Sequence, residues 1–554
     1  MTLQKFLSLL LAFFAGIWWN VYPFFNNMIN NYFFEVDASV LGGILPNVKS
    51  NINRYGGRFP EDPVVNEEYN PYEFADYIQL MECSGGNDGR DLFRDPKDFS
   101  VIDDYDFEPL LASCRGILKV GCKPLLKFGN VPAKLSRRTL ENSPEDTGAF
   151  DVNVYPPDDY NEYYDYIKAI CLALIDEFGS EEVRSWRFGV LTEYENKDWF
   201  HTPDGSPENS LTAYCRLYDY TVQALIDTVG GDVFVGAHSM TCSEGLWDER
   251  EFIRHCGVGA NYATGKKGTR ICYLSASYYE NCPGDVGDRL SVPEITEMFR
   301  ETARSVGLDG LIYGVDEGRI LYGLRSGGTD VQLPSRTVGF SYQAGFDARL
   351  IKQMFDCGMN YFSSWDYCSL GENHGLPLIT YFVAERAARF EGAKKAGVRA
   401  VKTGHIPDAD VNVAAGYNED TGTLYVMAYN YKNKLDYHSD ADVSLRLKVP
   451  QLDGKEVSVT AYRINDDCNW FDEWDKERET LGVTDDMFAW SPDDGCPNWT
   501  DNEGRRIFLE QQERYREYCR LEPIESETGV KDGEISIKTT LRPHEVVFFE
   551  IEKK

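Results

Sequence analysis

Apolar positions between residues 76 and 391 follow two alternating patterns. In Tyr160–Phe178, apolar side chains recur three or four residues apart, a spacing that predicts an amphipathic helix with one buried face. After a short turn at Gly179-Ser180, the bulky residues of Trp186–Leu191 predict a buried strand. This strand ends abruptly in a loop of acidic and aromatic residues that begins at Thr192. Helix, turn, strand and acidic loop together form one αβ unit.

The same unit recurs along this part of the chain. Strands are predicted at Asp76–Cys83, Lys123–Gly129, Val233–Ala237, Arg270–Ser277, Gly310–Val315 and Met359–Ser364. Helices are predicted at Pro109–Val120, Tyr214–Thr228, Glu251–Cys256, Pro293–Val306 and Ala344–Cys357. Such alternation is typical of a parallel sheet, and its length suits an α/β fold of the (β/α)8 (TIM) barrel type. A doubly wound open sheet is the alternative, but no glycine-rich phosphate fingerprint supports its dinucleotide-binding form.

The pattern changes beyond residue 400 to short alternating segments separated by Gly, Asp, Asn and Pro. Strands are predicted at Thr423–Tyr431, Val443–Val449, Val457–Arg463, Glu534–Thr540 and Val546–Ile551. This arrangement predicts a C-terminal antiparallel β-sandwich. An acidic insertion, Asn465–Pro523, interrupts it, and its tryptophans either line a ligand cleft or pack the insertion onto the barrel. Packing is favoured because large aromatic side chains mostly contribute burial energy. The tryptophans are Trp470, Trp474, Trp490 and Trp499.

The first residues form an uncharged apolar run, Phe6–Trp19, behind a single lysine. With Val21–Phe25 the run approaches the ~20 residues that span a bilayer, and its front half is typical of a signal peptide. An uncleaved signal anchor and a cleaved signal peptide fit equally well, and a buried helix is the third interpretation. We expect an exported or membrane-anchored chain with residues 1–30 as signal or anchor, 31–395 as barrel and 396–554 as sandwich.

Composition narrows the possible functions. The formal net charge of −34 makes nucleic acid and anionic membrane surfaces poor partners, because phosphate binding needs clustered basic residues. The 14 cysteines permit disulfides in an exported chain, but their spacing does not reveal pairs. No metal or organic cofactor is expected, since no CxxC or HxxxH spacing is present.

Two glutamates follow predicted strands, Glu193 and Glu317. The carboxyl ends of barrel strands surround one cavity, so we expect both side chains to face it. A pair of carboxylates flanking an acetal carbon is the equipment of glycoside hydrolysis, where one donates a proton and the other attacks the anomeric carbon. Glu195 is the neighbouring candidate acid, but Glu193 is closer to the strand end.

Several segments resemble glycoside hydrolase family 39, a group of retaining clan A barrels that includes β-xylosidases and α-L-iduronidases. Each resembling segment is short, but together they extend over most of residues 76–554. They are Lys123–Leu135, Trp186–Trp199, Leu274–Tyr279, Tyr313–Glu317, Tyr462–Trp474 and Leu541–Ile551.

The resemblance implies roles for individual residues. Glu193 would be the acid/base and Glu317 the nucleophile, with Tyr279 hydrogen-bonded to the nucleophile and Trp365 forming a sugar-stacking wall. Thr192 stands where the family has an Asn that grips the substrate's 2-hydroxyl, a contact worth several kcal/mol in the transition state.

Two further positions depart from the family pattern, and two carry weaker expectations. Ser277 stands where the family has His, and Asp316 where it has Thr. His238 is a candidate sugar contact or a structural loop histidine, and Asp366 a candidate hydroxyl contact or ion-pair partner.

We therefore expect an exported retaining glycosidase acting on an oligosaccharide or other glycoside. Two alternatives stay open: a glycan-binding barrel that has lost catalysis, and a surface adhesion protein whose sandwich does the binding.

Overall fold

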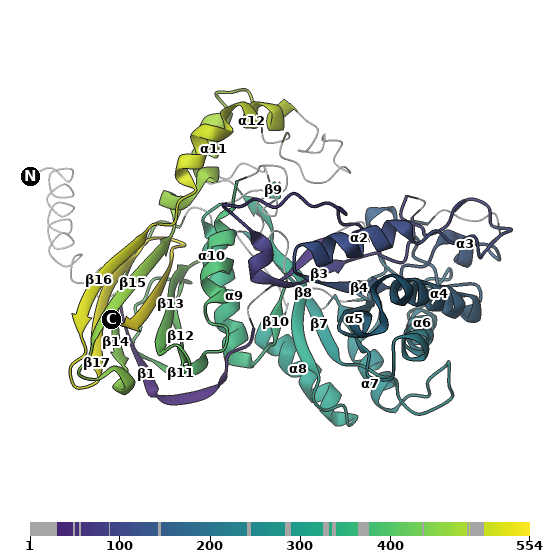
Figure 1. Cartoon of the computed structure of the whole chain (residues 1–554), viewed down its shortest axis with the longest axis horizontal. Helices are drawn as coiled ribbons and strands as arrows, with labels where there is room; N and C mark the ends of the chain where they lie inside the picture. Colours follow the sequence, from purple (N-terminus) through teal and green to yellow (C-terminus); the bar gives the residue numbers. More distant parts are fainter. Residues whose placement is uncertain are drawn as a thin grey trace, which may run out of the picture.

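A parallel sheet forms the centre of the computed structural model in Figure 1. The structure describes residues 30–554 apart from 48–49, 55–56, 88, 142–145, 241–244, 283–289, 325–331, 335–339, 364–375, 435–436, 485–486 and 488–502. The predicted signal or anchor lies outside these residues except for Asn30. Across the described ranges, no helix is both long and apolar enough to cross a bilayer.

Eight parallel strands are described in this sheet, and they follow one another in chain order. They are β2 (Ser50–Arg54), β3 (Ala75–Leu80), β4 (Lys123–Phe128), β5 (Arg187–Val190), β6 (Phe234–Ser239), β7 (Tyr273–Cys282), β8 (Ile312–Leu324) and β10 (Tyr361–Phe362). A short strand, β9 (Gln332–Pro334), pairs antiparallel with β8. Residues of β2 lie close to β8 and β10, which brings the two edges of the sheet together. The predicted (β/α)8 barrel is confirmed.

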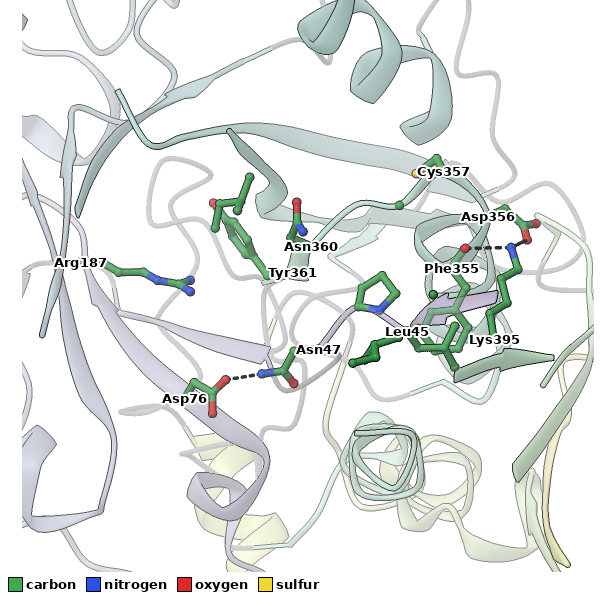
Figure 2. A pocket seen from close by; sticks show the side chains of 15 residues that line it. Leu45, Asn47, Asp76, Arg187, Phe355, Asp356, Cys357, Asn360, Tyr361 and Lys395 are labelled. Carbon is green, nitrogen blue, oxygen red and sulfur yellow. Dashed lines mark hydrogen bonds and ion pairs between the residues drawn. The ribbon is translucent and has the colours of Figure 1, made fainter. Parts of the chain in front are cut away.

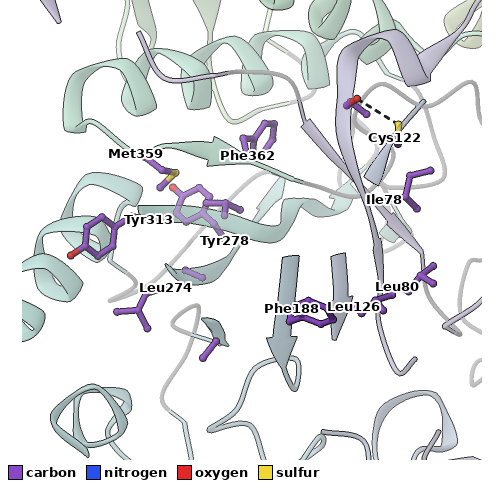
Figure 3. Close-up of a cluster of buried hydrophobic side chains, with 14 of the residues drawn as sticks. Ile78, Leu80, Cys122, Leu126, Phe188, Leu274, Tyr278, Tyr313, Met359 and Phe362 are labelled. Atoms are coloured by element: carbon purple, nitrogen blue, oxygen red, sulfur yellow. Dashed lines mark hydrogen bonds between the residues drawn. The ribbon is translucent and has the colours of Figure 1, made fainter. Parts of the chain in front are cut away.

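Helices cover the outside of this sheet (Figure 1). They are α2 (Glu108–Lys119), α3 (Ala133–Ser136), α4 (Tyr160–Phe178), α5 (Ser180–Arg184), α6 (Pro207–Thr228), α7 (Glu249–Val258), α8 (Val292–Ser305), α9 (Tyr342–Cys357) and α10 (Ile379–Ala388). Apolar side chains of alternate strand residues, among them Leu126, Phe188 and Leu274, fill the layer between sheet and helices (Figure 3). Their burial stabilises the scaffold that positions the strand ends.

The other face of the strands points into the barrel, where glycines make room for two tyrosine rings. A Cβ atom at Gly236 would lie 2.3 Å from the ring of Tyr273, and one at Gly314 would lie 2.2 Å from the ring of Tyr361. The two rings meet edge to face at 6.3 Å between centroids. These rings fill the barrel at the end where the strands begin. Polar residues closer to the carboxyl ends of the strands therefore lie above a packed aromatic layer.

The second sheet contains nine described strands in the order β16-β15-β18-β13-β12-β11-β1-β14-β17. They are β1 (Asn31–Ile44), β11 (Lys394–Lys402), β12 (Asp410–Asn418), β13 (Thr423–Tyr431), β14 (Ala441–Lys448), β15 (Glu456–Ile464), β16 (Pro523–Gly529), β17 (Glu534–Leu541) and β18 (Val546–Lys553). Residues such as Val36, Val426, Leu445 and Phe549 share one buried cluster separate from the barrel core. Neighbouring strands are antiparallel except for the pair β1–β14, so this mostly antiparallel unit is consistent with the predicted sandwich.

Strand β1 differs from the predicted domain boundary, which assigns it to the barrel. It pairs parallel with β14 and antiparallel with β11, so both ends of the chain build the sandwich. The physical reason is where its apolar face is buried: Tyr32, Phe34 and Val36 lie on one face of the strand and pack into the cluster that contains Val426 and Leu445. The barrel therefore begins after β1.

Two tryptophans of the insertion are core residues. Trp470 and Trp474, on α11 (Trp470–Arg478), are fully buried. Trp470 Nε1 donates to the carbonyl of Pro377 at 2.7 Å, and Trp474 meets the ring of Phe508 on α12 (Glu503–Tyr515) edge to face. Both pack the insertion, as predicted, whereas Trp490 and Trp499 lie outside the described residues. Cys83, Cys114, Cys468 and Cys519 are buried thiols without a disulfide.

Candidate active site

Glu193 lies in a tight turn directly after β5. Leu191 and Glu193 both have positive φ angles, 67° and 46°, a backbone conformation that residues other than glycine rarely adopt. Such backbone strain clusters at functional sites, where the surrounding structure holds it in place. The turn directs the Glu193 side chain into the barrel, where only 6% of the residue is exposed. Asn196, from the same loop, donates to Glu193 Oε2 at 2.7 Å.

Glu317 is positioned by a β-bulge. The register between β7 and β8 shifts between Ala276 and Ser277, so that Asp316 is an extra residue opposite them. A bulge lets two successive residues face one side of a sheet, whereas a regular strand would place them on opposite sides. Asp316 and Glu317 are both buried, and both contact residues inside the barrel. The hydroxyl of Tyr279, on β7, donates to Glu317 Oε1.

The structure brings the two glutamates together. One carboxylate oxygen of Glu193, one of Glu317 and one ring nitrogen of His238 all lie within 4.8 Å of one another. Retaining glycosidases hold their two carboxyl groups ~5–5.5 Å apart, whereas inverting enzymes need ~6.5–9.5 Å to admit a water. The observed separation therefore favours the retaining arrangement.

The surroundings of Glu193 raise its pKa into the neutral range. Burial and the negative charge of Glu317 raise the pKa of Glu193 to about 7. Hydrogen bonds from Ser277 and Asn196 and the charge of Lys127 act in the opposite direction. A carboxyl group with this pKa populates both protonation states at neutral pH, as a group that alternates between acid and base must.

A buried cation, Lys127, was not among the predicted site residues. It lies on β4 with no exposure, 2.9 Å from Asp316 Oδ2 and 2.7 Å from His238 Nδ1. The sequence feature that points to Lys127 is a lysine inside the apolar strand segment Lys123–Gly129, because a buried ammonium group requires polar or charged partners. Those partners come from β6 and β8, which the sequence of β4 alone does not indicate.

Glu82, which follows β3, is a third buried carboxylate that the sequence did not single out. Arg90 donates to its Oε2 atom. Burial raises the pKa of Glu82 to about 7 against the opposing charge of Arg90, and Glu317 adds to the rise. Glu82 and Arg90 therefore contribute to the electrostatic field around Glu317.

The remaining predicted site residues have mixed positions. Thr192 is buried beside Glu193, and its Oγ1 atom has no hydrogen-bond partner among the described residues. His238 is fully buried, with one ring nitrogen at Lys127 and the other 2.9 Å from Ser277 Oγ, so it is held by protein groups rather than open to a sugar. Trp365 and Asp366 lie outside the described residues.

The carboxylate of Glu195 is held by protein groups at the end of β6. Its Oε1 atom accepts from Ser239 Oγ at 2.5 Å and from the backbone N–H of Met240 at 2.8 Å. These bonds tie the loop after β5 to the end of β6. Glu195 therefore fixes the loop that carries Glu193, which supports the choice of Glu193 as the candidate acid.

The cluster of Glu193, His238 and Glu317 also has the donor types of a metal site. Two features oppose a cation there. Both ring nitrogens of His238 already have protein partners, and one partner is the ammonium of Lys127. The cluster fits proton chemistry better than metal binding.

A cavity of 680 Å³ lies at the opposite end of the barrel (Figure 2). Its lining includes Asp76, Arg187, Ile312 and Tyr361, which stand at the beginnings of their strands. Figure 2 shows Asn47 hydrogen-bonded to Asp76 and Lys395 paired with Asp356 in this region. Because catalytic groups of such barrels gather at the carboxyl ends of the strands, this cavity is separate from the site of Glu193 and Glu317.

Comparisons with known proteins agree with this geometry. The sequence profile of glycosyl hydrolases family 39 matches residues 88–398. A β-xylosidase of Caldicellulosiruptor saccharolyticus is 26% identical over 165 residues, which cover 30% of this chain and 31% of the relative. A β-xylosidase of Geobacillus stearothermophilus is 26% identical over 195 residues, 33% and 36% of the two chains. The aligned parts thus span about a third of these curated relatives.

Solved structures share the whole architecture. The GH39 enzyme from Xanthomonas axonopodis pv. citri superposes with a TM-score of 0.61 at 14% identity, covering 94% of this chain and 97% of that one. A monomeric β-xylosidase from Caulobacter crescentus CB15 gives 0.61 at 17% identity, covering 94% and 99%. At these identities the likeness establishes the fold. Since the family profile matches more than half of the sequence, this chain belongs to glycosyl hydrolases family 39.

Proposed function

We propose that this chain is a retaining glycoside hydrolase that uses Glu317 as nucleophile and Glu193 as acid/base. The observation that carries the proposal is the approach of the two buried carboxyl groups to within 4.8 Å at the carboxyl ends of β5 and β8. Family membership supports the reaction class. The two relatives described as β-xylosidases make pentosides the first substrates to try.

The reaction has two steps. In the first, Glu317 attacks the anomeric carbon and forms a glycosyl-enzyme, while the protonated Glu193 gives its proton to the departing oxygen. In the second, Glu193 takes a proton from water, which attacks the anomeric carbon and releases Glu317. Tyr279, which donates to Glu317, orients the nucleophile before attack. No step requires a metal or an organic cofactor.

The sugar-binding residues follow from the same proposal. Thr192 lies next to the acid/base and has a hydroxyl without a partner among the described residues, so it is our candidate for a contact near the 2-hydroxyl. Trp365 and Asp366 are proposed as the stacking wall and a hydroxyl contact on the basis of the family resemblance. His238 acts on the site through Ser277 rather than by touching the sugar.

Covalent labelling tests the proposal. The chain is incubated with mechanism-based inactivators that trap a glycosyl-enzyme, drawn from a panel of pentosides, hexosides and uronides. We expect one equivalent of label on Glu317, located by peptide mass spectrometry, and parallel loss of aryl glycoside hydrolysis. Reversible glycan binding without label or turnover across the panel would instead support a glycan-binding barrel that has lost catalysis.

We also propose that the apolar segment Phe6–Trp19 exports the chain or anchors it in a membrane. Its length and lack of charge support this role. The full chain and a variant with Leu9, Leu10 and Leu11 replaced by Asp are expressed in cells with a secretory pathway and fractionated. The parent is expected in the secreted or membrane fraction and the variant in the cytoplasm. Cytoplasmic recovery of both would contradict the proposal.

A further inference from the structure

A line of hydrogen bonds crosses the barrel from β4 to the acid/base. Lys127 Nζ is 2.7 Å from His238 Nδ1, and His238 Nε2 is 2.9 Å from Ser277 Oγ. Ser277 Oγ then donates to Glu193 Oε1 at 2.5 Å. All four residues are buried, and they come from three strands and the turn after β5. Water therefore does not compete for these contacts.

The charge on Lys127 fixes the direction of every proton in this line. An ammonium group only donates, so His238 Nδ1 must accept. Burial and the charge of Lys127 hold the pKa of His238 well below its usual value, so the ring is neutral and its single proton is on Nε2. That nitrogen donates to Ser277, which leaves the hydroxyl proton of Ser277 free to point at Glu193.

Asp316 holds the cation at the start of the line. Its Oδ2 atom is 2.9 Å from Lys127 Nζ, and its Oδ1 atom accepts from the hydroxyl of Tyr361 at 2.6 Å. Burial alone would raise the pKa of Asp316, but Lys127 and His238 leave it below the usual value. A buried ion pair of this kind keeps both members charged only when its geometry and hydrogen bonds are complete.

We infer that Lys127, His238 and Ser277 form a one-way hydrogen-bond line that sets the protonation of Glu193, and that Asp316 anchors this line through Lys127. This inference rests on the proposed role of Glu193 as acid/base. The four are positioning residues, because they act on the reaction through Glu193. Ser277 and Asp316 are two of the three positions at which the sequence departs from the family resemblance, the third being Thr192, and the structure joins these two in a single network.

Several groups face Glu193 and determine its titration. Glu317 lies opposite on β8, Lys127 on β4, Ser277 on β7 and Asn196 in its own loop. Around them, Glu82, which follows β3 and pairs with Arg90, interacts with Glu317, Tyr279 donates to Glu317, and His238 is neutral. Within this set, Ser277 and Lys127 favour the ionised form of Glu193. Removing either should therefore raise the pKa of Glu193.

The test is the alkaline limb of kcat/KM for an aryl glycoside. This limb reports the loss of the acid's proton in the free enzyme, so activity falls as the pH rises through the pKa of Glu193. In Ser277→Ala, the limb should move upward by about one pH unit, because a hydrogen bond to the ionised carboxylate is lost. Ser113→Ala is the matched control, since Ser113 is a buried serine on α2 that donates to the carbonyl of Pro109. Its limb should coincide with that of the parent.

Substitutions of His238 separate the hydrogen-bond line from simple packing. Glutamine carries one acceptor and one donor in a planar amide, so His238→Gln should keep the limb near that of the parent. Leucine carries neither, so His238→Leu should shift the limb upward. A purely structural role would lower activity equally at every pH in both variants and leave the limb in place.

A double variant and a spectroscopic readout keep the inference testable if a single variant fails to fold or loses activity. Lys127→Met combined with Asp316→Leu replaces the ion pair by apolar side chains, which avoids a lone buried charge, and it should shift the limb in the same direction. The protonated carboxyl band of Glu193, identified by its loss in Glu193→Gln, can also be titrated by infrared difference spectroscopy without substrate. Unchanged titration of this band in folded Ser277→Ala would overturn the inference, even in a chain that lacks hydrolytic activity. Missing covalent label on Glu317 in the parent would count against the proposed function alone.

Discussion

Glu317→Gln is expected to lower kcat/KM by on the order of 10⁴-fold for any glycoside that the parent cleaves, because the amide cannot form the glycosyl-enzyme. This loss corresponds to about 5 kcal/mol of transition-state stabilisation. The two side chains have nearly the same size, and Tyr279 can still donate to the remaining carbonyl oxygen, so the site should keep its shape. Steady-state kinetics with aryl glycosides measures the loss, and the mechanism-based inactivator should no longer label the protein.

Glu301→Gln provides the control for removing one carboxylate. Glu301 is exposed on α8, away from the strand ends, so its substitution should leave kcat/KM unchanged. Circular dichroism and the thermal midpoint should agree for parent, Glu317→Gln and Glu301→Gln. Activity of folded Glu317→Gln within tenfold of the parent would remove Glu317 as nucleophile.

The regular elements of this fold are readable from the sequence because their side chains obey local periodicities. Helix α4 spans Tyr160–Phe178, the range that the three-to-four spacing predicts, and β13 spans Thr423–Tyr431. The acidic loop after β5 was also predictable, since a strand that ends in polar and aromatic residues marks the catalytic end of a barrel. From that rule alone, Glu193 and Glu317 are expected to share a cavity, and the structure places them together.

Contacts between segments far apart in the chain could not be predicted from the sequence in the same way. The alternation in β1 shows that one face is buried, but it does not show which sheet buries it. Its partners, β11 and β14, follow more than 300 residues later. Chain order alone therefore assigns β1 to the barrel, and its pairing with β11 and β14 corrects this prediction.

The polar network inside the barrel could not be predicted from the sequence for a related reason. Asp316 and Glu317 would face opposite sides of a regular strand, and only the bulge in β8 lets both contact interior residues. Sequence spacing does not locate a bulge, so neither the Lys127–Asp316 pair nor the path through His238 could be inferred. His238 was expected at the site, and the structure gives it protein partners instead of an open approach to substrate.

Glu193→Ala should slow hydrolysis to a degree that depends on the leaving group. For glycosides with a basic leaving group, kcat/KM should fall by roughly 10²–10⁴-fold, the usual contribution of a general acid. Aryl glycosides with a strongly acidic phenol need little protonation to depart, so formation of their glycosyl-enzyme should slow much less. The alkaline limb of the pH profile should also disappear, since the group whose pKa is about 7 has been removed.

The second step of the same variant gives an independent check. Without Glu193 no base activates water, so the glycosyl-enzyme formed on Glu317 should accumulate and hydrolyse slowly. Azide needs no deprotonation and fits the space left by the side chain, so it should restore turnover and give a glycosyl azide with the configuration of the substrate. Glu193 is buried beside Glu317, with Ser277 and Asn196 holding its two oxygens, so the azide would enter at the face from which water attacks. Equal losses for basic and acidic leaving groups, with no azide rescue, would mean that Glu193 supports the site without transferring the proton.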